Sequence, residues 1–241
     1  MTHMETLNSS DMRLTTDSVK IIDCHKHWTP EMAHAEEIVD KTIFSVRPSE
    51  FNPVPGVKYS IGIHPWYLDN VEEELELLKR HIDHPQVVAI GEIGLDKLKK
   101  DVPFSLQREV LETQLQLANE HRKPVVLHIV RAIPYVVNIR EEYPAIPSVV
   151  FHAYQGRIKQ ATELTELGFF LSFGEKYSRS ALQLIPVDKI LVESDADMID
   201  FDEHIEEIAS LRGLKPYEMK QQIKQNIHSA FFGSKFVNTN Y

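Results

Sequence analysis

The sequence predicts an α/β protein that folds as a single TIM-type (β/α)₈ barrel, and three observations favour this fold. Short apolar, β-branched runs alternate with amphipathic stretches, which is the pattern of parallel strands joined by helices. Several of these runs are almost continuously apolar, as expected of strands buried on both faces. The length of 241 residues suits one such barrel, which typically takes about 250 residues.

Eight runs qualify as strands. They are Val19–Cys24, Thr42–Val46, Val57–Ile63, Val87–Ile90, Pro124–Leu127, Ser148–Phe151, Gly168–Phe173 and Lys189–Val192. A doubly wound open sheet is the alternative arrangement for such a pattern. We favour the barrel because metal-binding residue types follow many of these strands, and the carboxyl ends of barrel strands converge on one catalytic face.

Amphipathic stretches between these strands predict the outer helices. They cover Pro30–Val39, Asn70–Ile82, Phe104–His121, Ile133–Glu142, Arg157–Leu167, Phe201–Leu211 and Pro216–Phe231. In the second of them, Leu75, Leu78 and Ile82 repeat at helical spacing. Only the proline-rich segment RPSEFNPVPG connects the second and third strands, so one barrel helix is expected to be missing there.

The composition predicts one globular domain. Hydrophobic residues make up 42% and charged residues 26% of the chain, which are ordinary values for a folded protein. We expect the domain to span residues 19–241 after a flexible, polar leader over residues 1–18. The formal net charge of −10 argues against broad, charge-driven binding of nucleic acid, although it does not exclude a local site that carries metal ions.

Several features of the sequence predict a cytoplasmic protein. Cys24 is the only cysteine, so no intramolecular disulfide can form, which suits a reducing compartment. No apolar run approaches the roughly 20 residues of a membrane span, and the first residues lack the apolar core of a signal peptide. We expect no membrane association and favour a monomer, with Cys24 as a small buried residue rather than a nucleophile.

Residues that can bind metal ions stand at or just past the ends of five predicted strands. They are His25, His27, Glu92, His128, His152 and Asp195. Side chains two apart on a strand point the same way, so His25 and His27 can reach one ion. The Glu92 carboxylate can bridge two cations with its two oxygens, and Gly91 and Gly94 beside it permit a close backbone approach.

Two of these residues, together with Glu193 and His64 nearby, are candidates for further roles. Asp195, in ILVESDAD, can bind a metal ion and also take a proton from water, so we assign catalytic roles to Asp195 and Glu92. Glu193 lies closer to the strand body and is expected to orient a metal ligand. His64, in SIGIHPW, either contacts the substrate or fixes the turn before Pro65.

The order of these motifs resembles the TatD family. The HxH pair at His25, then GIHPW, GEIGLD, the PxxxH strand that ends at His128, HAYQG and ESDAD follow one another as in that family. The resemblance runs from about Ile21 to Phe231, and GEIGLD together with GIHPW is highly specific. It implies a metal-dependent hydrolase on an amidohydrolase-like barrel, and many members are described as deoxyribonucleases.

Position by position, the resemblance implies two divalent cations. The ligands of one would be His25, His27, Glu92 and Asp195, and those of the other would be Glu92, His128 and His152, so that Glu92 is shared. His64 and Arg131 match positions that would touch a substrate phosphate. The mixed imidazole and carboxylate ligands suit Zn, Mn, Fe or Ni, because a Mg-only site usually consists of oxygen atoms. The resemblance adds Mg as an activating ion.

Three departures from the family pattern affect the substrate more than the metal site. The segment between His27 and His64 is shorter than usual, in keeping with the missing helix. Arg131 lies three residues after His128, where the common pattern places it two after. Asp197 stands where the family commonly has proline.

Positive charges in the predicted loops favour an anionic substrate, such as DNA. They are Lys97, Lys99, Lys100, Arg131, Arg157, Lys176 and Arg179. The alternative is that these are ordinary solvated loop charges. The reaction we expect is hydrolysis of a phosphoester bond, in DNA or a small phosphodiester, by a metal-activated water. Trp28, Trp66 and Tyr154 near the predicted mouth either stack on a base or pack the barrel rim.

Three other functions remain open at the level of sequence. The first is a two-metal hydrolase of a small-molecule amide or lactone; related barrels often carry a modified lysine where this chain has Glu92, which favours phosphoesters. The second is a non-catalytic metal-binding module, whose signature would be the loss of a ligand. The third is a barrel whose buried histidines are purely structural.

Overall fold

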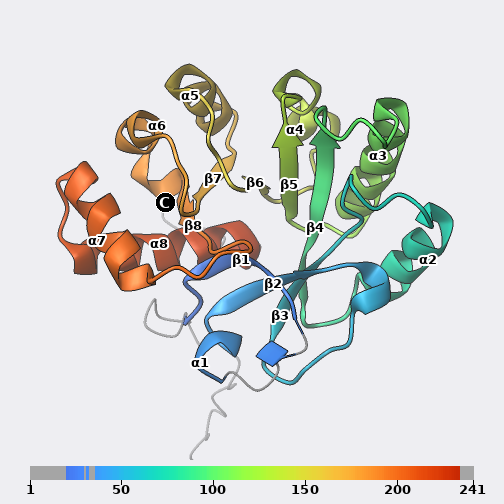
Figure 1. The fold of residues 1–241 in the computed structure, drawn as a ribbon, viewed down its shortest axis with the longest axis horizontal. Helices are drawn as coiled ribbons and strands as arrows, with labels where there is room; N and C mark the ends of the chain where they lie inside the picture. Colours follow the sequence, from blue (N-terminus) through green and yellow to red (C-terminus); the bar gives the residue numbers. More distant parts are fainter. Residues whose placement is uncertain (1–19, 30, 33–35, 234–241) are drawn as a thin grey trace, which may run out of the picture.

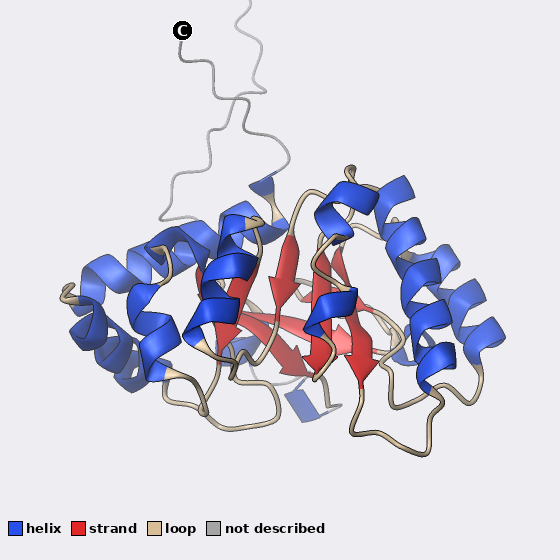
Figure 2. Cartoon of the chain, turned by 90° about the horizontal axis from the view of Figure 1, so that it is seen from above, coloured by secondary structure: helices blue, strands red, loops and turns tan. Residues whose placement is uncertain are grey.

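A computed structural model of the chain describes residues 20–29, 31–32 and 36–233, which form a barrel of eight parallel strands (Figure 1, Figure 2). Each strand pairs with the next one along the chain, from β1 to β8. An isolated parallel bridge between Lys26 and Asp195 joins the first strand to the segment after the last. The predicted TIM-type barrel is confirmed, and the open-sheet alternative is wrong.

The strands agree with the predicted runs to within a few residues at most ends. They are β1 Asp23–His27, β2 Thr42–Val46, β3 Lys58–Ile61, β4 Val87–Asp96, β5 Val125–Val130, β6 Val149–Phe151, β7 Phe170–Phe173 and β8 Ile190–Val192. Their side chains are almost entirely buried. Each fully buried Val, Leu or Ile stabilises such a core by about 1.5–3 kcal/mol.

Three strands continue further than their predicted runs. β1 extends to His27, which pairs with Ser45 of β2, and β4 and β5 extend to Asp96 and Val130, which pair with each other. His25, His27, Glu92 and His128 therefore lie within strands rather than after them. The prediction ended these strands early because residues at the catalytic end of a barrel carry polar side chains, which interrupt the apolar pattern.

The helices lie outside the strands (Figure 2). They are α1 Glu36–Val39, α2 Val71–His81, α3 Phe104–Glu120, α4 Ile139–Glu142, α5 Ile158–Glu166, α6 Arg179–Leu184, α7 Phe201–Arg212 and α8 Pro216–Phe231. The predicted helix Ile133–Glu142 is in fact a 3-10 turn, Ile133–Tyr135, followed by α4. α6 was not predicted, because its six residues are too few to show a helical period. Of the predicted helix Pro30–Val39, residues 30 and 33–35 lie outside the described residues.

The connection between β2 and β3 has no α-helix, as the sequence predicts. Residues 47–57 contain one 3-10 turn, Pro48–Glu50. Phe51 in this connection packs against Tyr59 of β3 and His81 of α2, with ring centroids 5.3 and 5.1 Å apart. The connection thus places an aromatic side chain against the barrel where a helix would otherwise pack.

The described part of the chain has one main hydrophobic cluster and a small second one around Ile63, Leu68 and Val110. Within this part, no helix has both the length and the apolar character needed to cross a bilayer. The predicted leader over residues 1–18 lies outside the described residues, and the domain bounds 19–241 stay a prediction.

Candidate metal centre

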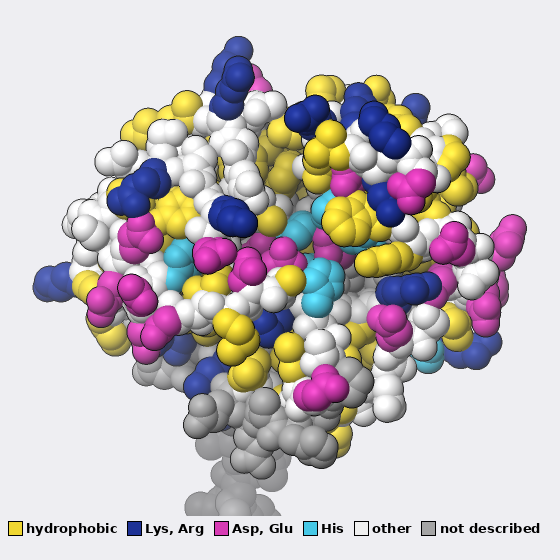
Figure 3. Space-filling model, in the orientation of Figure 1, with side chains coloured by type: hydrophobic (Ala, Val, Ile, Leu, Met, Phe, Trp, Pro, Cys, Tyr) yellow, Lys and Arg dark blue, Asp and Glu magenta, His cyan; other side chains and the backbone are white. Residues whose placement is uncertain are grey.

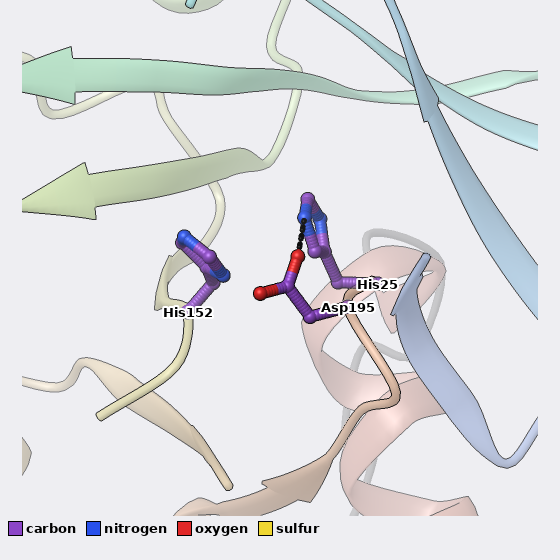
Figure 4. Close-up of side chains that lie close together, drawn as sticks. All are labelled: His25, His152 and Asp195. Atoms are coloured by element: carbon purple, nitrogen blue, oxygen red, sulfur yellow. Dashed lines mark ion pairs between the residues drawn. The ribbon is translucent and has the colours of Figure 1, made fainter. Parts of the chain in front are cut away.

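Glu92, on β4, lies at the centre of the candidate site, and each of its two oxygens faces a different group of imidazoles. Near Oε2 lie His25 Nε2, at 3.2 Å, and His27 Nε2, at 3.5 Å. Asp195, just after β8, completes this first group: its Oδ1 lies 3.3 Å from His27 Nε2 and 3.9 Å from His25 Nε2. Figure 4 shows the Asp195 carboxylate between the rings of His25 and His152.

The second group surrounds the other oxygen of Glu92. His152 Nε2 lies 2.7 Å and His128 Nδ1 2.8 Å from Oε1. His64 Nε2, which follows β3, lies 3.2 Å from the same oxygen. His128 lies within β5 and His152 directly follows β6, so the parallel pairing of these neighbouring strands brings the two side chains together.

These side chains fit a metal centre. All six predicted ligands meet here, and their donor atoms form three overlapping groups in which every atom lies within 4.8 Å of the others. The groups are His25, His152 and Asp195; His25, His27 and Glu92; and His64, Glu92 and His128. Both ring nitrogens of His25 and Glu92 Oε2 are buried without a hydrogen-bond partner among the described residues. Buried polar atoms are costly to leave unpaired, and a bound cation would satisfy them.

The carboxylates are held in their charged form. Burial alone would raise the pKa of Glu92, but the surrounding imidazoles, with His152 foremost, hold it well below its usual range. Burial likewise would raise the pKa of Asp195, yet the hydrogen bond from His27 and the charge of His25 bring it down to about 2. Burial lowers the pKa of His64, which favours the neutral ring. The hydrogen bond with Asp195 raises the pKa of His27, and although burial would lower the pKa of His152, Glu92 and Glu193 hold it well above its usual range. Metal ions bind ionised carboxylates and neutral imidazoles, so a cation would displace protons from these two rings.

Glu193 orients one of the histidines, as predicted from the sequence. Its Oε1 lies 3.3 Å from His152 Nδ1 and accepts a hydrogen bond of 2.7 Å from the Ala153 backbone N–H. Its Oε2 accepts a hydrogen bond from Ser172 Oγ, which also lies 3.1 Å from Cys24 Sγ. Cys24 is buried, as expected of a packing residue.

Asp96 has a matching role at His128 and was not predicted. Its Oδ2 lies 3.4 Å from His128 Nε2 and accepts a hydrogen bond of 2.7 Å from Trp66 Nε1. Asp96 lies four residues after Glu92 on β4, so the two side chains share one face of the strand. The even spacing of Glu92 and Asp96 indicates a shared face only if the strand reaches Asp96. The apolar run ends at Ile90, so the sequence prediction does not include Asp96 in the strand.

The glycines beside Glu92 allow close packing of β4 on β5. A Cβ atom on Gly94 would lie 1.8 Å from the carbonyl oxygen of His128, and one on Gly91 would lie 2.6 Å from Val126 Cβ. The predicted close backbone approach is therefore found, but it is to the neighbouring strand. It sets the distance between the strands that carry Glu92 and His128.

The site opens into a cavity of about 580 Å³, which is in the usual range for small-molecule sites. Figure 3 shows histidine and acidic side chains gathered around a hollow near the middle of this face. Trp28, Trp66 and Tyr67 line the cavity together with five of the six candidate ligands, all but His25. A second cavity, of about 600 Å³, is lined by Lys26 and Asp197 and by none of the six candidate ligands.

Of the residues predicted to touch or stack on the substrate, His64 lines the cavity, whereas Arg131 and Tyr154 do not. His64 faces Glu92 with Nε2, while its Nδ1 accepts a hydrogen bond of 3.1 Å from the Trp66 backbone N–H, so it also fixes the turn. Arg131 is exposed and is not among the residues that line the cavity. Tyr154 is fully buried and donates its hydroxyl to the Arg157 carbonyl, so it packs the barrel rather than stacking on a base.

None of the seven predicted loop cations lines this cavity. Lys97 lies over the Tyr135 ring, Lys99 pairs with Asp101 at 3.0 Å, and Arg179 pairs with Glu207. Among the described residues, the one lysine or arginine that does line it is Arg47, just after β2. Sequence reasoning missed Arg47 because it stands in a loop, where side-chain direction has no periodic signal.

Comparison with known proteins places these features in a family. The sequence model of the TatD related DNase family matches residues 49–232. A Bacillus subtilis (strain 168) protein named as the metal-dependent hydrolase YabD is 34% identical over 149 residues. That match covers 58% of this chain and 58% of the Bacillus protein, so it spans under three fifths of the relative's length.

Two solved structures share the fold. The TatD homologue YjjV from Escherichia coli K12 superposes with a TM-score of 0.77 at 24% identity, over 88% of this chain and 98% of that one. A TatD family hydrolase from Entamoeba histolytica superposes with a TM-score of 0.68 at 15% identity, over 89% of this chain and 99% of that one.

Proposed function

The chain belongs to the TatD related DNase family, and from that premise we propose that it hydrolyses phosphoester bonds with the help of two divalent cations. One observation carries the proposal: the two oxygens of Glu92 face separate groups of histidines. A carboxylate in that position can bridge two cations, which is the arrangement of two-metal phosphoesterases.

Each cation would have its own ligands. His25, His27, Asp195 and Glu92 Oε2 would hold one, and His128, His152 and Glu92 Oε1 would hold the other, with His64 close enough to contribute. When bound, the cations would supply positive charge that lowers the pKa of a nearby water and stabilises charge on the phosphoryl oxygens. Imidazole with carboxylate favours Zn, Mn, Fe or Ni, while the family also brings in Mg.

Asp195 is suited to handle the proton. Its side chain is 35% exposed, so the carboxylate reaches the cavity, and its low pKa keeps it ionised at neutral pH. In the proposed reaction Asp195 accepts a proton from the attacking water, whose oxygen bonds to phosphorus. The bond from phosphorus to the leaving oxygen breaks, and that oxygen takes up the proton.

An anionic substrate, of which DNA is one candidate, suits the rest of the cavity. Trp66 and Tyr67 are 42% and 47% exposed and offer ring faces on which a base can stack. The Trp66 ring is held by its hydrogen bond to Asp96, so stacking on it would need little further ordering. In this proposal His64, where it does not bind a cation, would contact one phosphate, and Arg47 would contact another.

The test is to measure metal content and hydrolysis on one preparation, with wild type beside Glu92→Ala. We expect about two metal ions per chain and cleavage of single-stranded DNA or a thymidine phosphodiester in the wild type, and loss of both in the variant. Amide and lactone substrates are assayed in parallel. Metal binding with turnover of an amide or lactone, and of no phosphoester, would overturn the proposed reaction and favour the small-molecule alternative.

A further inference from the structure

We propose that Arg47 forms a second anion-binding subsite, which holds the phosphate next to the scissile one in an oligonucleotide. This inference rests on the proposed phosphoester hydrolysis and adds to it a preference for substrates with at least two phosphates. It concerns a residue outside the metal centre, on the side of the cavity formed by β2 and β3.

Arg47 is well placed for this role. It is the first residue after β2, so it lies at the same strand ends that carry the metal site. Its side chain lines the same cavity as Glu92 and Asp195, and within the described ranges no other lysine or arginine does. A phosphate that lies beyond the reach of the cations would therefore meet Arg47 in the cavity lining, while Lys99, which is not among the lining residues, lies 5.8 Å from the centre of the Trp66 ring.

The guanidinium is held in place before any ligand arrives. Its Nη2 donates a hydrogen bond of 2.7 Å to Glu74 Oε1, on α2, and its Cζ lies 5.5 Å from the centre of the Tyr67 ring. Glu74 is buried and also accepts hydrogen bonds from the backbone N–H and the hydroxyl of Ser49. An arginine fixed on one edge and beside an aromatic ring is pre-organised to bind an anion.

Arg47 keeps donors that the protein does not use. A guanidinium has five N–H groups, and the hydrogen bond to Glu74 occupies one of them. Nη1 donates to no other described residue, and Nε is buried without a partner. The side chain is 32% exposed and lines the cavity, whereas its Nε is buried. A phosphate can accept two parallel hydrogen bonds from a guanidinium, whereas a lysine acts only as a point charge.

Pairing with the buried Glu74 explains one edge of the Arg47 guanidinium and leaves its other donors unassigned. The two hydrogen bonds from Ser49 already tie this connection to Glu74 on α2. No α-helix follows β2. The 3-10 turn Pro48–Glu50 begins two residues after Val46, and Arg47, between the strand and this turn, lines the cavity. Arg131, which the family pattern would place at a phosphate, lies outside this cavity.

The experiment compares two substrates that differ by one thymidine and one phosphate, the dinucleotide d(TpT) and the trinucleotide d(TpTpT). The quantity measured is the ratio of kcat/KM for the longer substrate to that for the shorter one. We expect Arg47→Ala to lower this ratio about ten-fold, and Arg47→Lys to restore only part of it. Arg80→Ala, an exposed arginine on α2, removes the same charge and is expected to leave the ratio unchanged.

A binding measurement separates the subsite from catalysis. Calorimetric titration with thymidine 3′,5′-bisphosphate and with thymidine 5′-monophosphate gives two dissociation constants for each variant. Arg47→Ala is expected to weaken binding of the bisphosphate about ten-fold more than binding of the monophosphate. Should Arg47→Ala melt far below the wild type, the comparison rests on Arg47→Lys, which keeps the aliphatic stem.

The outcomes are distinct. Equal loss on both substrates and both ligands would mean that Arg47 only supports the loop, and unchanged ratios would mean that no second phosphate binds there; either result overturns the subsite. If the wild type cleaves neither oligonucleotide, the proposed function fails. The difference between the two thymidine phosphates would then still decide whether Arg47 binds a second phosphate.

Discussion

The backbone N–H of Asp195 donates a hydrogen bond of 2.9 Å to the carbonyl oxygen of His25. In return, the Asp195 carbonyl accepts a hydrogen bond of 3.2 Å from the His27 backbone N–H. The first strand and the segment after the last are thus joined at three residues whose side chains all enter the site. The first group of ligands is complete only when the barrel is closed.

Asp195→Asn should lower kcat about 10²–10⁴-fold, because the amide cannot accept the proton from the attacking water. The backbone bonds to His25 and His27 do not involve the side chain, so circular dichroism and the melting profile should resemble those of the wild type. Asp197→Asn is the matched control, an exposed carboxylate two residues further on. A kcat within about three-fold of the wild type would contradict the role of Asp195 as base.

Glu193→Gln should weaken metal binding about 10–100-fold, as found for residues that orient metal-binding histidines. The amide keeps the size of the carboxylate but loses the charge that faces His152 Nδ1. Competition with a coloured chelator gives the affinity directly. Glu166→Gln, on the exposed side of α5, serves as control, and equal affinities in all three proteins would show that Glu193 does not act through His152.

Removal of metal should lower the melting temperature. A ligand that binds only the folded state at 100 to 1,000 times its Kd stabilises by about 3–4 kcal/mol, which for a chain of this size corresponds to about 6–16 °C. Melting curves before dialysis against EDTA, after it and after metal is restored give the shift. Glu92→Ala should show no such shift, and a wild-type curve unaffected by EDTA would favour a purely structural cluster of histidines.

His204 should make stability depend on pH below neutrality. This residue of α7 is buried, with Nε2 3.1 Å from the Phe173 carbonyl oxygen, and burial lowers its pKa below the usual value near 6.5. The unfolded chain therefore binds the proton more readily, and the stability present above about pH 6.5 is lost as pH falls through the native pKa.

His204→Gln should reduce that loss, because glutamine keeps a donor but does not titrate. The measurement is the urea midpoint at pH 7.5 and pH 5.0 for both proteins in the presence of EDTA. The other histidines are common to both and cancel in the difference. An identical pH dependence in the two proteins would refute the assignment.

Gly94→Ala should prevent normal folding, since a Cβ atom there would meet the His128 carbonyl oxygen at 1.8 Å. Neither β4 nor β5 can move without displacing Glu92 or His128. Gly213→Ala is the control: Gly213 ends α7 in the left-handed region with no atom within 4 Å of the added carbon, so the cost should be only about 1 kcal/mol. Urea titration of both variants compares their free energies of unfolding. A loss in Gly94→Ala as small as that in Gly213→Ala would show that β4 and β5 can move apart easily.

The sequence was sufficient to predict the barrel and the six candidate ligands for one physical reason. Strands buried on both faces are continuously apolar, so a histidine or carboxylate at the end of such a run stands out. His128 and His152 were found in this way. The even spacing of His25 and His27 was informative because strand geometry alone decides which side chains share a face.

What the sequence did not reveal depends on contacts between distant segments. Asp96 was missed because pairing with β5 extends β4 beyond its apolar run. Arg47 was missed because its direction is set by Glu74, which lies 27 residues further along the chain. Of the predicted loop cations, Arg179 pairs with the distant Glu207 of α7, whereas Lys99 pairs with Asp101 in its own loop.

The helix-free connection between β2 and β3 contributes to the wall of the cavity but supplies none of the candidate metal ligands. The six candidate ligands come from β1, β4, β5, β6 and the segment after β8, so none depends on residues 47–57. Insertions or replacements in that connection can reshape one wall of the cavity while the chemistry stays intact. Arg47 and Glu50 are the residues of this connection that line the cavity, so grafting the connection between relatives, with the buried Phe51 and Val57 kept, is a direct way to vary substrate preference by design.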